Sequence, residues 1–355
     1  MQLLLTNSFG TFDITNMVPS VQWSGDYQQI ARTLSFGILS SATDKTIPTV
    51  DCSLGCTVQL VVGGEVLFDG KIRSRTISTE GSTIDVVCYD RGFVLKRTKV
   101  LKTYTNKTPT EIVRDLAGFY NIPLGIIADP DVRITRNFVT GRDSIMDVIQ
   151  TAYTLASQTT KKAYHIGFRG RKLYITVKEP DQRTLILRGG ANLISATTTE
   201  SVENMVNAVQ IYNINGKFLR EIADQEAIKL HDRLQEIVKQ TKNDNKAAEA
   251  QKLLDNGGVT QKITVHCLGN VANVTGGTVV VQEPYTGLYG LFYIDSDVHE
   301  WKRGQYYNKL TLNFKAIMDE KEAGSLPNAT GSKTGGNGAS DKIIFEHEYG
   351  WDSND

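Results

Sequence analysis

Three side chains that could bind a metal ion or transfer protons lie close together near the end of the chain. Asp295, Asp297 and His299 alternate along a predicted strand, so their side chains should point to the same side. Two carboxylates and an imidazole on one face could bind a divalent ion. These residues lie in a polar stretch just before Trp301, however, and no second group of ligands accompanies them. We therefore expect solvated side chains here, with no metal, no cofactor and no catalytic role.

Other arrangements that could do chemistry are weaker. His266 and Cys267 are neighbours on a predicted strand, so their side chains face opposite sides and do not form a hydrogen-bonded pair. The chain contains no nucleophile elbow, no zinc-protease motif, no phosphate-binding loop and no dinucleotide fingerprint. A catalytic carboxylate pair of the glycosidase type needs no local spacing, so the sequence leaves that possibility open. The prediction is a protein that is not an enzyme.

Charge and cysteine content narrow the class of protein. The 39 basic and 39 acidic side chains cancel, so no overall field attracts the chain to nucleic acid or to an anionic membrane. The start of the chain lacks a basic segment, and no later apolar run reaches membrane-spanning length. Four scattered cysteines, at 52, 56, 88 and 267, are too few for a disulfide framework and are expected to be reduced. These features predict a soluble chain made in the cytoplasm.

Two stretches are locally basic. Residues 91–107 contain six Lys and Arg, including Arg97 and Lys99, and no acid, while residues 161–172 contain five more together with His165. Surfaces that bind nucleic acid have such a composition. The balanced net charge and the few interleaved aromatic residues argue against specific binding to nucleic acid. We interpret the basic stretches as a subunit interface or a solvated face, with Arg97 and Lys99 as candidate contacts.

The elements that carry these residues show one β pattern twice. Around residues 57–89 an apolar run is followed by a glycine turn, by Leu67-Phe68 and by an alternating run that a further glycine interrupts. Residues 278–315 follow the same order, with Leu291-Phe292 in the matching place. Alternation interrupted by glycine is typical of strands and hairpins. Its recurrence indicates duplicated β modules in one chain.

Between the two copies the pattern changes to helix. Thr108 and Glu111 have the spacing of a capping box, which predicts a helix over 109–119. Apolar residues at helical spacing predict a second helix from about Asp143, and two alternating runs over 164–177 predict a hairpin. The chain then divides into a first β domain (1–100), a small α+β domain (101–180) and a second β domain (181–320).

The second β domain carries a polar segment that predicts a helical insertion at about 216–258. Asn243 and Asp244 are expected to cap a helix that ends near Asn256. Residues 224–239 fit either a helix or a short helix followed by a strand. Both alternatives remain open.

Residues 321–355 differ in composition from everything before them. Glycine and serine predict a flexible linker. Beyond it, three adjacent apolar residues, Ile343, Ile344 and Phe345, and then Trp351 stand among acidic residues. Two interpretations remain open: a disordered end, or a peptide that docks on a partner protein.

Several short segments carry a resemblance to a known family through their order. They are Val21-Gln22-Trp23-Ser24-Gly25, Ala31-Arg32-Thr33-Leu34-Ser35-Phe36, Leu67-Phe68-Asp69-Gly70-Lys71-Ile72, Leu268-Gly269-Asn270 and the stretch 290–301. In these segments the chain resembles the baseplate hub proteins of contractile phage tails and tailocins, in the branch carried by Gram-positive prophages. The resemblance runs from residue 1 to about 318. It implies a homotrimer whose chains each supply two tube-like β-barrel domains, so that six domains form a ring between a sixfold tail tube and a threefold spike.

The predicted fold class is α+β, mostly β, with two related tube-like β-barrel domains flanking the small α+β domain. The predicted function is a structural hub of a contractile tail or tailocin baseplate, located in the virion or tailocin particle and assembled in the bacterial host cytoplasm. Expected partners are two further copies of the chain, the tail tube protein, the spike protein and other baseplate proteins, with no membrane and no specific nucleic acid. Candidate interface residues are Trp23, Arg32, Arg97, Lys99, Ile343, Ile344, Phe345 and Trp351. The alternative is a tail-tip hydrolase that degrades peptidoglycan.

Overall fold

The chain up to Asp90 alternates apolar and polar residues and forms an antiparallel sheet. The structure, a computed structural model, describes residues 1–41, 44, 46–78, 81–135, 138–139, 143–180, 184–241 and 246–320. The first β unit contains β1 (Gln2–Asn7), β2 (Gly10–Asp13), η1 (Thr15–Met17), β3 (Ser20–Asp26), β4 (Gln29–Leu39), β5 (Thr57–Val62), β6 (Glu65–Ile77) and β7 (Thr83–Asp90). In β4 every second residue from Ile30 to Ile38 is buried, as expected for a strand with one face on a core. The sheet order is β3-β4-β7-β6-β5-β1-β2.

The second β unit repeats this arrangement. Its strands are β15 (Leu185–Arg188), β16 (Leu193–Ser201), β20 (Thr260–Leu268), β21 (Thr278–Glu283), β22 (Leu288–Lys302) and β23 (Gln305–Asn313), in the order β16-β20-β23-β22-β21-β15. In chain order they take the places of β1, β3, β4, β5, β6 and β7. The predicted duplication is therefore confirmed, because β5-β6-β7 and β21-β22-β23 are matching antiparallel meanders. The outermost pair differs: β1 is antiparallel to β5, whereas β15 is parallel to β21.

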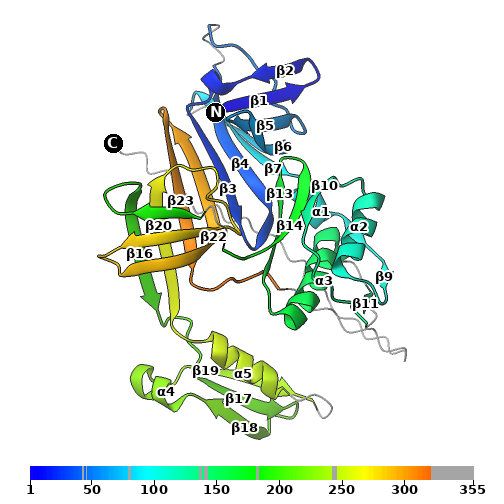
Figure 1. The fold of residues 1–355 in the computed structure, drawn as a ribbon, viewed down its shortest axis with the longest axis vertical. Helices are drawn as coiled ribbons and strands as arrows, with labels where there is room; N and C mark the ends of the chain where they lie inside the picture. Colours follow the sequence, from blue (N-terminus) through cyan, green and yellow to red (C-terminus); the bar gives the residue numbers. More distant parts are fainter. Residues whose placement is uncertain are drawn as a thin grey trace. The chain divides into compact units, whose positions relative to one another are not determined.

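Both β units belong to one 13-stranded sheet (Figure 1). The joint exists because β22 extends beyond its pairing with β21 and there pairs with β3, so that Ser296–Lys302 lie beside Ser20–Asp26. The mostly β, α+β class is confirmed. The predicted barrels are not: no sheet in the described part of the chain closes on itself, and the long sheet has free outer strands at β2 and β16.

Capping boxes start both long helices of the α+β region. The elements are α1 (Gly92–Arg97), β8 (Lys99–Val100), β9 (Thr103–Tyr104), α2 (Pro109–Phe119), β10 (Leu124–Ile127), β11 (Phe138–Val139), β12 (Asp143–Ser144), α3 (Ile145–Thr160), β13 (Tyr164–Arg169) and β14 (Lys172–Val177). As predicted, Thr108 Oγ1 accepts a hydrogen bond from Glu111 N at 3.2 Å, and Glu111 Oε2 accepts one from Thr108 N at 2.9 Å. Ser144 and Asp147 form an equivalent box on α3. The predicted β13–β14 hairpin is also confirmed.

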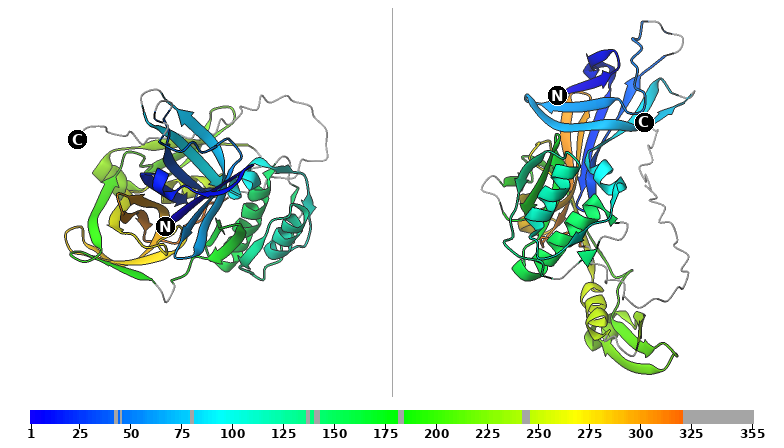
Figure 2. Two further views of the ribbon diagram at one scale, coloured as in Figure 1. Left: turned by 90° about the horizontal axis from the view of Figure 1, so that it is seen from above. Right: turned by 90° about the vertical axis from the view of Figure 1, so that its right-hand side faces the viewer.

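An α+β insertion lies between β16 and β20, where the first β unit has only the short β3–β4 turn (Figure 2). It contains β17 (Ala208–Asn213), β18 (Phe218–Ala223), α4 (Gln225–His231), β19 (Gln235–Gln240) and α5 (Ala247–Asn256). The sheet β18-β17-β19 packs on Ala250 of α5 through Val209, Ile211 and Val238. The insertion therefore has strands as well as the predicted helices, and the alternative of a short helix followed by a strand over 224–239 is right. The expected caps Asn243 and Asp244 lie outside the described residues.

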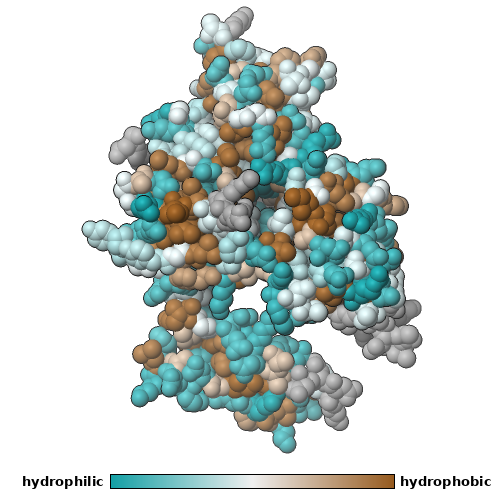
Figure 3. Space-filling model, viewed as in Figure 1, coloured by the Kyte–Doolittle hydropathy of each residue, from teal (hydrophilic) through white to brown (hydrophobic). Residues whose placement is uncertain are grey.

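Separate apolar clusters fill the three main regions. Those of the first and second β units are built from inward-facing strand residues, and that of the α+β region combines α1–α3 with β13 and β14. Ile30 of β4 and Met318 also contact the α+β cluster, so this region packs on residues from both ends of the chain. Figure 3 shows hydrophobic patches between hydrophilic regions on one face. The most exposed apolar side chains include Phe9 in the β1–β2 turn and Ile77 at the end of β6.

The cysteines and the lengths of the helices bear on the class of protein. All four cysteines are free thiols; Cys52, Cys88 and Cys267 are buried and Cys56 is partly buried. Among the described residues, no helix is both long and apolar enough to cross a membrane. The predicted linker and docking peptide, residues 321–355, lie outside the described residues.

Candidate functional site

The joint between β3 and β22 places a set of polar side chains inside the protein. In this antiparallel register Asp297 lies opposite Gly25, and His299 lies opposite Trp23. Because β22 also pairs with β23 on its other side, both edges of its second half are covered. Asp297 and His299 are fully buried, and Trp23 is 4% exposed. The expectation of solvated side chains at Asp297 and His299 is therefore wrong. We call this joint, formed by Ser20–Asp26 and Ser296–Lys302, the intrachain seam.

An ion pair between β4 and β22 crosses the seam. Arg32 Nη1 donates to Asp297 Oδ1 at 3.0 Å, and Nη2 donates to Oδ2, so the contact is bidentate. Asp297 Oδ1 also accepts hydrogen bonds from the backbone N and the Oγ1 of Thr275, each at 2.6 Å. Burial alone would raise the pKa of Asp297, but the Arg32 guanidinium and the hydrogen bond with His299 hold it well below its usual range. The carboxylate is therefore charged and fully coordinated by the chain.

Only glycine at position 25 leaves room for the Arg32 guanidinium. A Cβ at this position would lie 2.3 Å from Arg32 Nη1, far closer than two such atoms approach each other. The Arg32 Cζ also lies 3.9 Å from the centre of the Trp23 ring, a cation–π contact. Arg32 is thus fixed by a carboxylate at its tip and by an indole face along its plane.

His299 has hydrogen-bond partners on both ring nitrogens. Its Nδ1 lies 2.7 Å from Tyr306 Oη and 2.9 Å from Asn308 Nδ2, and its Nε2 lies 3.0 Å from the carbonyl oxygen of Asn273 and 3.1 Å from Asp297 Oδ2. This arrangement fits the tautomer with the proton on Nε2, because Asn308 donates to Nδ1, whereas the Asn273 carbonyl oxygen and the Asp297 carboxylate can only accept. No nitrogen is left to bind a metal or to accept a proton from a substrate. No group of three His, Cys, Asp or Glu residues suitable for a metal ion occurs among the described residues.

Asp295 belongs to a different contact, because a β-bulge shifts the register between Ile294 and Ser296. Its Oδ2 accepts a hydrogen bond from Asn313 Nδ2 at 3.0 Å, and its Oδ1 lies 3.8 Å from the buried Nζ of Lys178. Burial raises the pKa of Asp295 and lowers that of Lys178. The three alternating residues therefore do not form one cluster.

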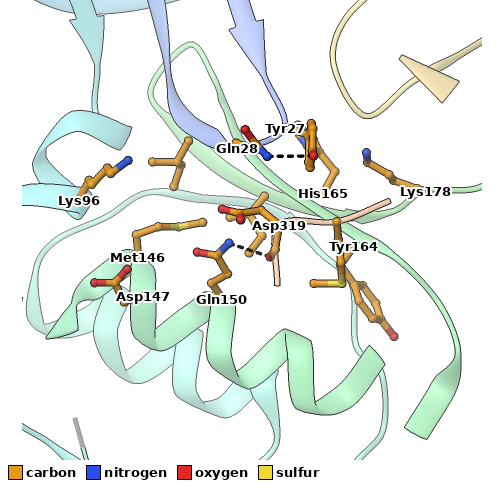
Figure 4. A pocket seen from close by; sticks show the side chains of 13 residues that line it. Tyr27, Gln28, Lys96, Met146, Asp147, Gln150, Tyr164, His165, Lys178 and Asp319 are labelled. Atoms are coloured by element: carbon orange, nitrogen blue, oxygen red, sulfur yellow. Dashed lines mark hydrogen bonds between the residues drawn. The ribbon is translucent and has the colours of Figure 1, made fainter. Parts of the chain in front are cut away.

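Lys178 also lines a pocket of about 100 Å³ between β13, α3 and the end of the described chain (Figure 4). Gln150 of α3 donates to the carbonyl oxygen of Asp319 at 2.7 Å, and Tyr27 contributes its ring from the β3–β4 turn. The pocket is large enough for a few water molecules. Its groups fasten the C-terminal end of the second β unit to the α+β region.

A larger cavity of about 570 Å³ lies among β3, β4, the β13–β14 hairpin and the loop before β21. Trp23, Arg32, His165 and Tyr174 are among its lining residues, and Asp26 is the one carboxylate among the described residues that line it. Loss of solvation, followed by repulsion from Lys178 and Arg32, lowers the pKa of His165 to about 3. Among the described residues, the lining therefore offers no pair of catalytic carboxylates and no imidazole that is protonated near neutral pH.

The candidate interface residues fall into three groups. Trp23 is buried within the intrachain seam, and Arg32 is buried beside it on β4. Arg97, at the end of α1, and Lys99, in β8, are exposed. The four apolar residues from Ile343 to Trp351 lie outside the described residues. Their role as contacts with a partner stays a prediction. The sequence argument missed Lys178 and Thr275, because their positions beside β22 follow from tertiary pairing.

Comparisons with known proteins give a consistent picture. A family described as YQBQ-like matches residues 21–313, from the second residue of β3 to the end of β23. In Bacillus subtilis (strain 168), the phage-like element PBSX protein XkdQ is 22% identical over 308 residues, covering 85% of this chain and 94% of that protein.

Solved structures share the fold. The 43 kDa tail protein of prophage MuSo2 from Shewanella oneidensis has a TM-score of 0.65 at 12% identity, with 88% of this chain and 98% of that chain covered. The E. coli c3393 protein, described as a type VI secretion component similar to the T4 tail proteins gp27 and gp5, has a TM-score of 0.50 at 11% identity, with 87% and 76% covered. The resemblance to phage tail proteins inferred from the sequence is confirmed.

The seam ion pair predicts a strong effect on stability. Asp297→Asn should lower the free energy of unfolding by about 3–5 kcal/mol, because it leaves the buried Arg32 charge without its counter-ion. Adding Arg32→Met to that variant should cost far less than the sum of the two single changes. Arg233→Met is the matched control: it removes an ion pair of 2.8 Å with Glu221 that is partly exposed, and should cost at most about 1 kcal/mol. Denaturant unfolding measures all four values. Equal losses for Asp297→Asn and Arg233→Met would contradict the assignment.

The same pair sets a pH dependence. Because the fold lowers the pKa of Asp297, its contribution to stability is present above the ordinary Asp pKa of about 4 and is lost as the pH falls below that value. Wild-type protein should therefore lose unfolding free energy on acidification more steeply than the Arg32→Met/Asp297→Asn double variant.

Proposed function

The chain belongs to the YQBQ-like family, and from that membership we propose that it is the hub of a contractile tail or tailocin baseplate. The proteins that share its sequence and fold are phage-like element and tail proteins, and the chain is a structural tail or baseplate component. The proposed hub is a homotrimeric ring that connects the sixfold tail tube to the threefold spike.

The observation that carries the proposal is the repeated strand order within one sheet. β3-β4-β7-β6-β5 and β16-β20-β23-β22-β21 follow the same path and join through the intrachain seam. One chain therefore holds two similar modules side by side, related by one strand-to-strand joint. Three such chains in a closed ring would present six similar modules to one neighbour while keeping threefold symmetry for another. Conversion between these symmetries is the task of a hub.

The proposed barrels and domain boundaries belong to this assembly. We place the tube-like modules at residues 1–100 and 181–320, the small α+β domain at 101–180, and a linker with a docking peptide at 321–355. No described sheet closes within one chain, so the tube wall would be completed by neighbouring copies. The proposed partners are the tube protein, the spike and other baseplate proteins, in a particle assembled in the bacterial cytoplasm.

The proposed role is structural and not enzymatic. Asp297 is held by Arg32 and Thr275, and Asp295 by Asn313 and Lys178. These carboxylates hold the fold together, and the described residues that line the larger cavity include a single acid, Asp26. None of these observations favours the alternative of a peptidoglycan hydrolase.

Subunit number tests the hub. Native mass spectrometry of the purified chain should show a trimer, and images of the particle along its axis should show a ring with six similar modules. Assemblies of two, four or five chains would contradict the proposal.

Hydrolysis tests the structural role. Purified protein should release no muropeptides from bacterial cell walls. Release that is reproducible, and that Asp26→Asn or Asp319→Asn abolishes without changing the melting temperature, would establish the hydrolase in place of the hub.

Truncation tests the docking peptide. Ile343, Ile344, Phe345 and Trp351 could each bury apolar surface worth about 1.5–3 kcal/mol, minus the cost of ordering the segment. Deletion of residues 341–355 should leave the ring folded and weaken attachment of one baseplate or spike component. Deletion of a Gly-rich stretch of equal length, residues 326–340, is the control and should keep the component bound. Full occupancy in both truncated particles would identify the segment as a plain chain end.

A further inference from the structure

In the intrachain seam β22 pairs with β3, but the equivalent strands of the opposite β units, β6 and β16, do not pair with each other within the described chain. β6 corresponds to β22 and β16 corresponds to β3, as chain order and sheet order both require. β6 and β22 can be aligned residue by residue. β6 shifts register against β7 between Ile72 and Ser74, as β22 does against β23 between Ile294 and Ser296. Ser74–Ile77 are therefore the equivalent of the β22 residues that pair with β3.

Both edges are free of strand partners within the described chain. β5 pairs with β6 only up to Lys71, so Ser74–Ile77 pair on one side only, with β7. Thr198–Ser201 of β16 likewise pair on one side only, with β20. Such edges present backbone N–H and C=O groups that can accept a further strand. In the seam, the corresponding edges of β22 and β3 are joined to each other.

Alternate side chains along the two edges face the core side of the sheet: Arg75 and Ile77 on β6, and Thr198 and Glu200 on β16. Arg75, Ile77 and Glu200 are exposed, and Thr198 is partly exposed. Arg75 and Ile77 lie opposite Val86 and Ile84 of β7, and side chains of directly opposed residues share one face. Ile77 is nevertheless 65% exposed. On β16, the Oγ1 of Thr198 is buried and has no hydrogen-bond partner among the described residues. In the seam, by contrast, the same face is closed by Trp23 and His299.

The register of the seam can be carried over to these edges. On β22, Asp297 and His299 correspond to Arg75 and Ile77, because both pairs follow the bulge at the same distance. On the other strand, Trp23 corresponds to Thr198, since each lies opposite the equivalent residue, Leu34 or Ile263, of the next strand.

With this register the residues opposite each other are complementary. Gly25 lies opposite Asp297 and Trp23 opposite His299, so Glu200 would lie opposite Arg75 and Thr198 opposite Ile77. Opposite charges that face each other across two strands stabilise the pair, whereas like charges destabilise it. The intrachain seam joins an arginine to an aspartate at the same level of the sheet.

We propose that Ser74–Ile77 of one copy pair in antiparallel fashion with Thr198–Ser201 of a second copy, with Arg75 of the first opposite Glu200 of the second. This interchain seam rests on the proposed hub function and supplies its subunit contact. It is a head-to-tail contact, which forms a ring when the rotation between copies closes. In a ring of three chains, intrachain and interchain seams alternate and no β6 or β16 edge is left over.

Cysteine pairing tests the register directly. Thr76 and Thr199 would be opposed, and Cα atoms of opposed residues in antiparallel strands lie about 4.5–5.5 Å apart, within the range that a disulfide spans. Full-length chain with Thr76→Cys and Thr199→Cys should give a covalent trimer under mild oxidation, reversed by reductant. Either single variant should stay uncrosslinked, and so should the control that combines Thr76→Cys with Lys239→Cys on β19 of the insertion.

Charge reversal provides the second readout. Arg75→Glu and Glu200→Arg should each weaken trimer formation about tenfold or more, since like charges then face each other, and the double exchange should restore it. Lys239→Glu, a charge change at an exposed position of the insertion, should have no effect. Circular dichroism and melting temperature verify that each variant is folded.

The possible results test the interchain seam and the hub function separately. A wild-type trimer whose double-cysteine variant forms no disulfide between positions 76 and 199, and which ignores both charge reversals, would overturn the interchain seam and leave the hub in place. Disulfide products that extend in a ladder beyond three chains would overturn ring closure. Wild-type chain that is monomeric in solution and is absent as a ring from the particle would remove the hub and the seam together.

Discussion

The buried ion pair between Arg32 and Asp297 is the contact on which the arrangement of the two β units depends. A charge that loses water on folding must be compensated inside the protein, and here the two charges come from opposite ends of the chain. Only the β3–β22 pairing brings them together. Backbone pairing alone would allow β3 and β22 to join in more than one register, whereas the bidentate contact above Gly25 selects one. Specificity of this kind is better supported here than a gain in stability, because buried pairs often add little net free energy.

The α+β region reinforces this arrangement from the side. Ile30, two residues before Arg32 on β4, packs into its core, and Met318 from beyond β23 does the same. Gln150 and Lys178 add polar contacts to Asp319 and Asp295. The region that lies between the two β units in the sequence thus contacts both of them in the fold. Three parts of the chain that could fold as separate domains share contacts instead.

Local signals in the sequence predicted much of this fold. The capping box at Thr108, the hairpin over 164–177 and the repeated meander all depend on residues close together in the chain, and all are present. What failed depends on partners far away in sequence. Asp297 looks solvated when only its sequence neighbours are considered, because no residue near it in the sequence indicates the contact with Arg32. The open form of the sheet was missed for the same reason, because local alternation does not show which distant strands pair. In the insertion, the strand β19 was one of two alternatives that the sequence left open, and β18 was not predicted.

The two β units differ in their outermost strand, since β1 runs antiparallel to β5 while β15 runs parallel to β21. The first unit also carries the β1–β2 hairpin with its exposed Phe9, which has no equivalent among the described strands of the second. In a ring built from such chains, two kinds of outer edge would alternate around the rim. A binding partner with six identical sites would fit only every second edge, whereas a partner with three sites would meet the same edge each time. The rim would then have threefold symmetry, although the strands beneath it have approximate sixfold symmetry.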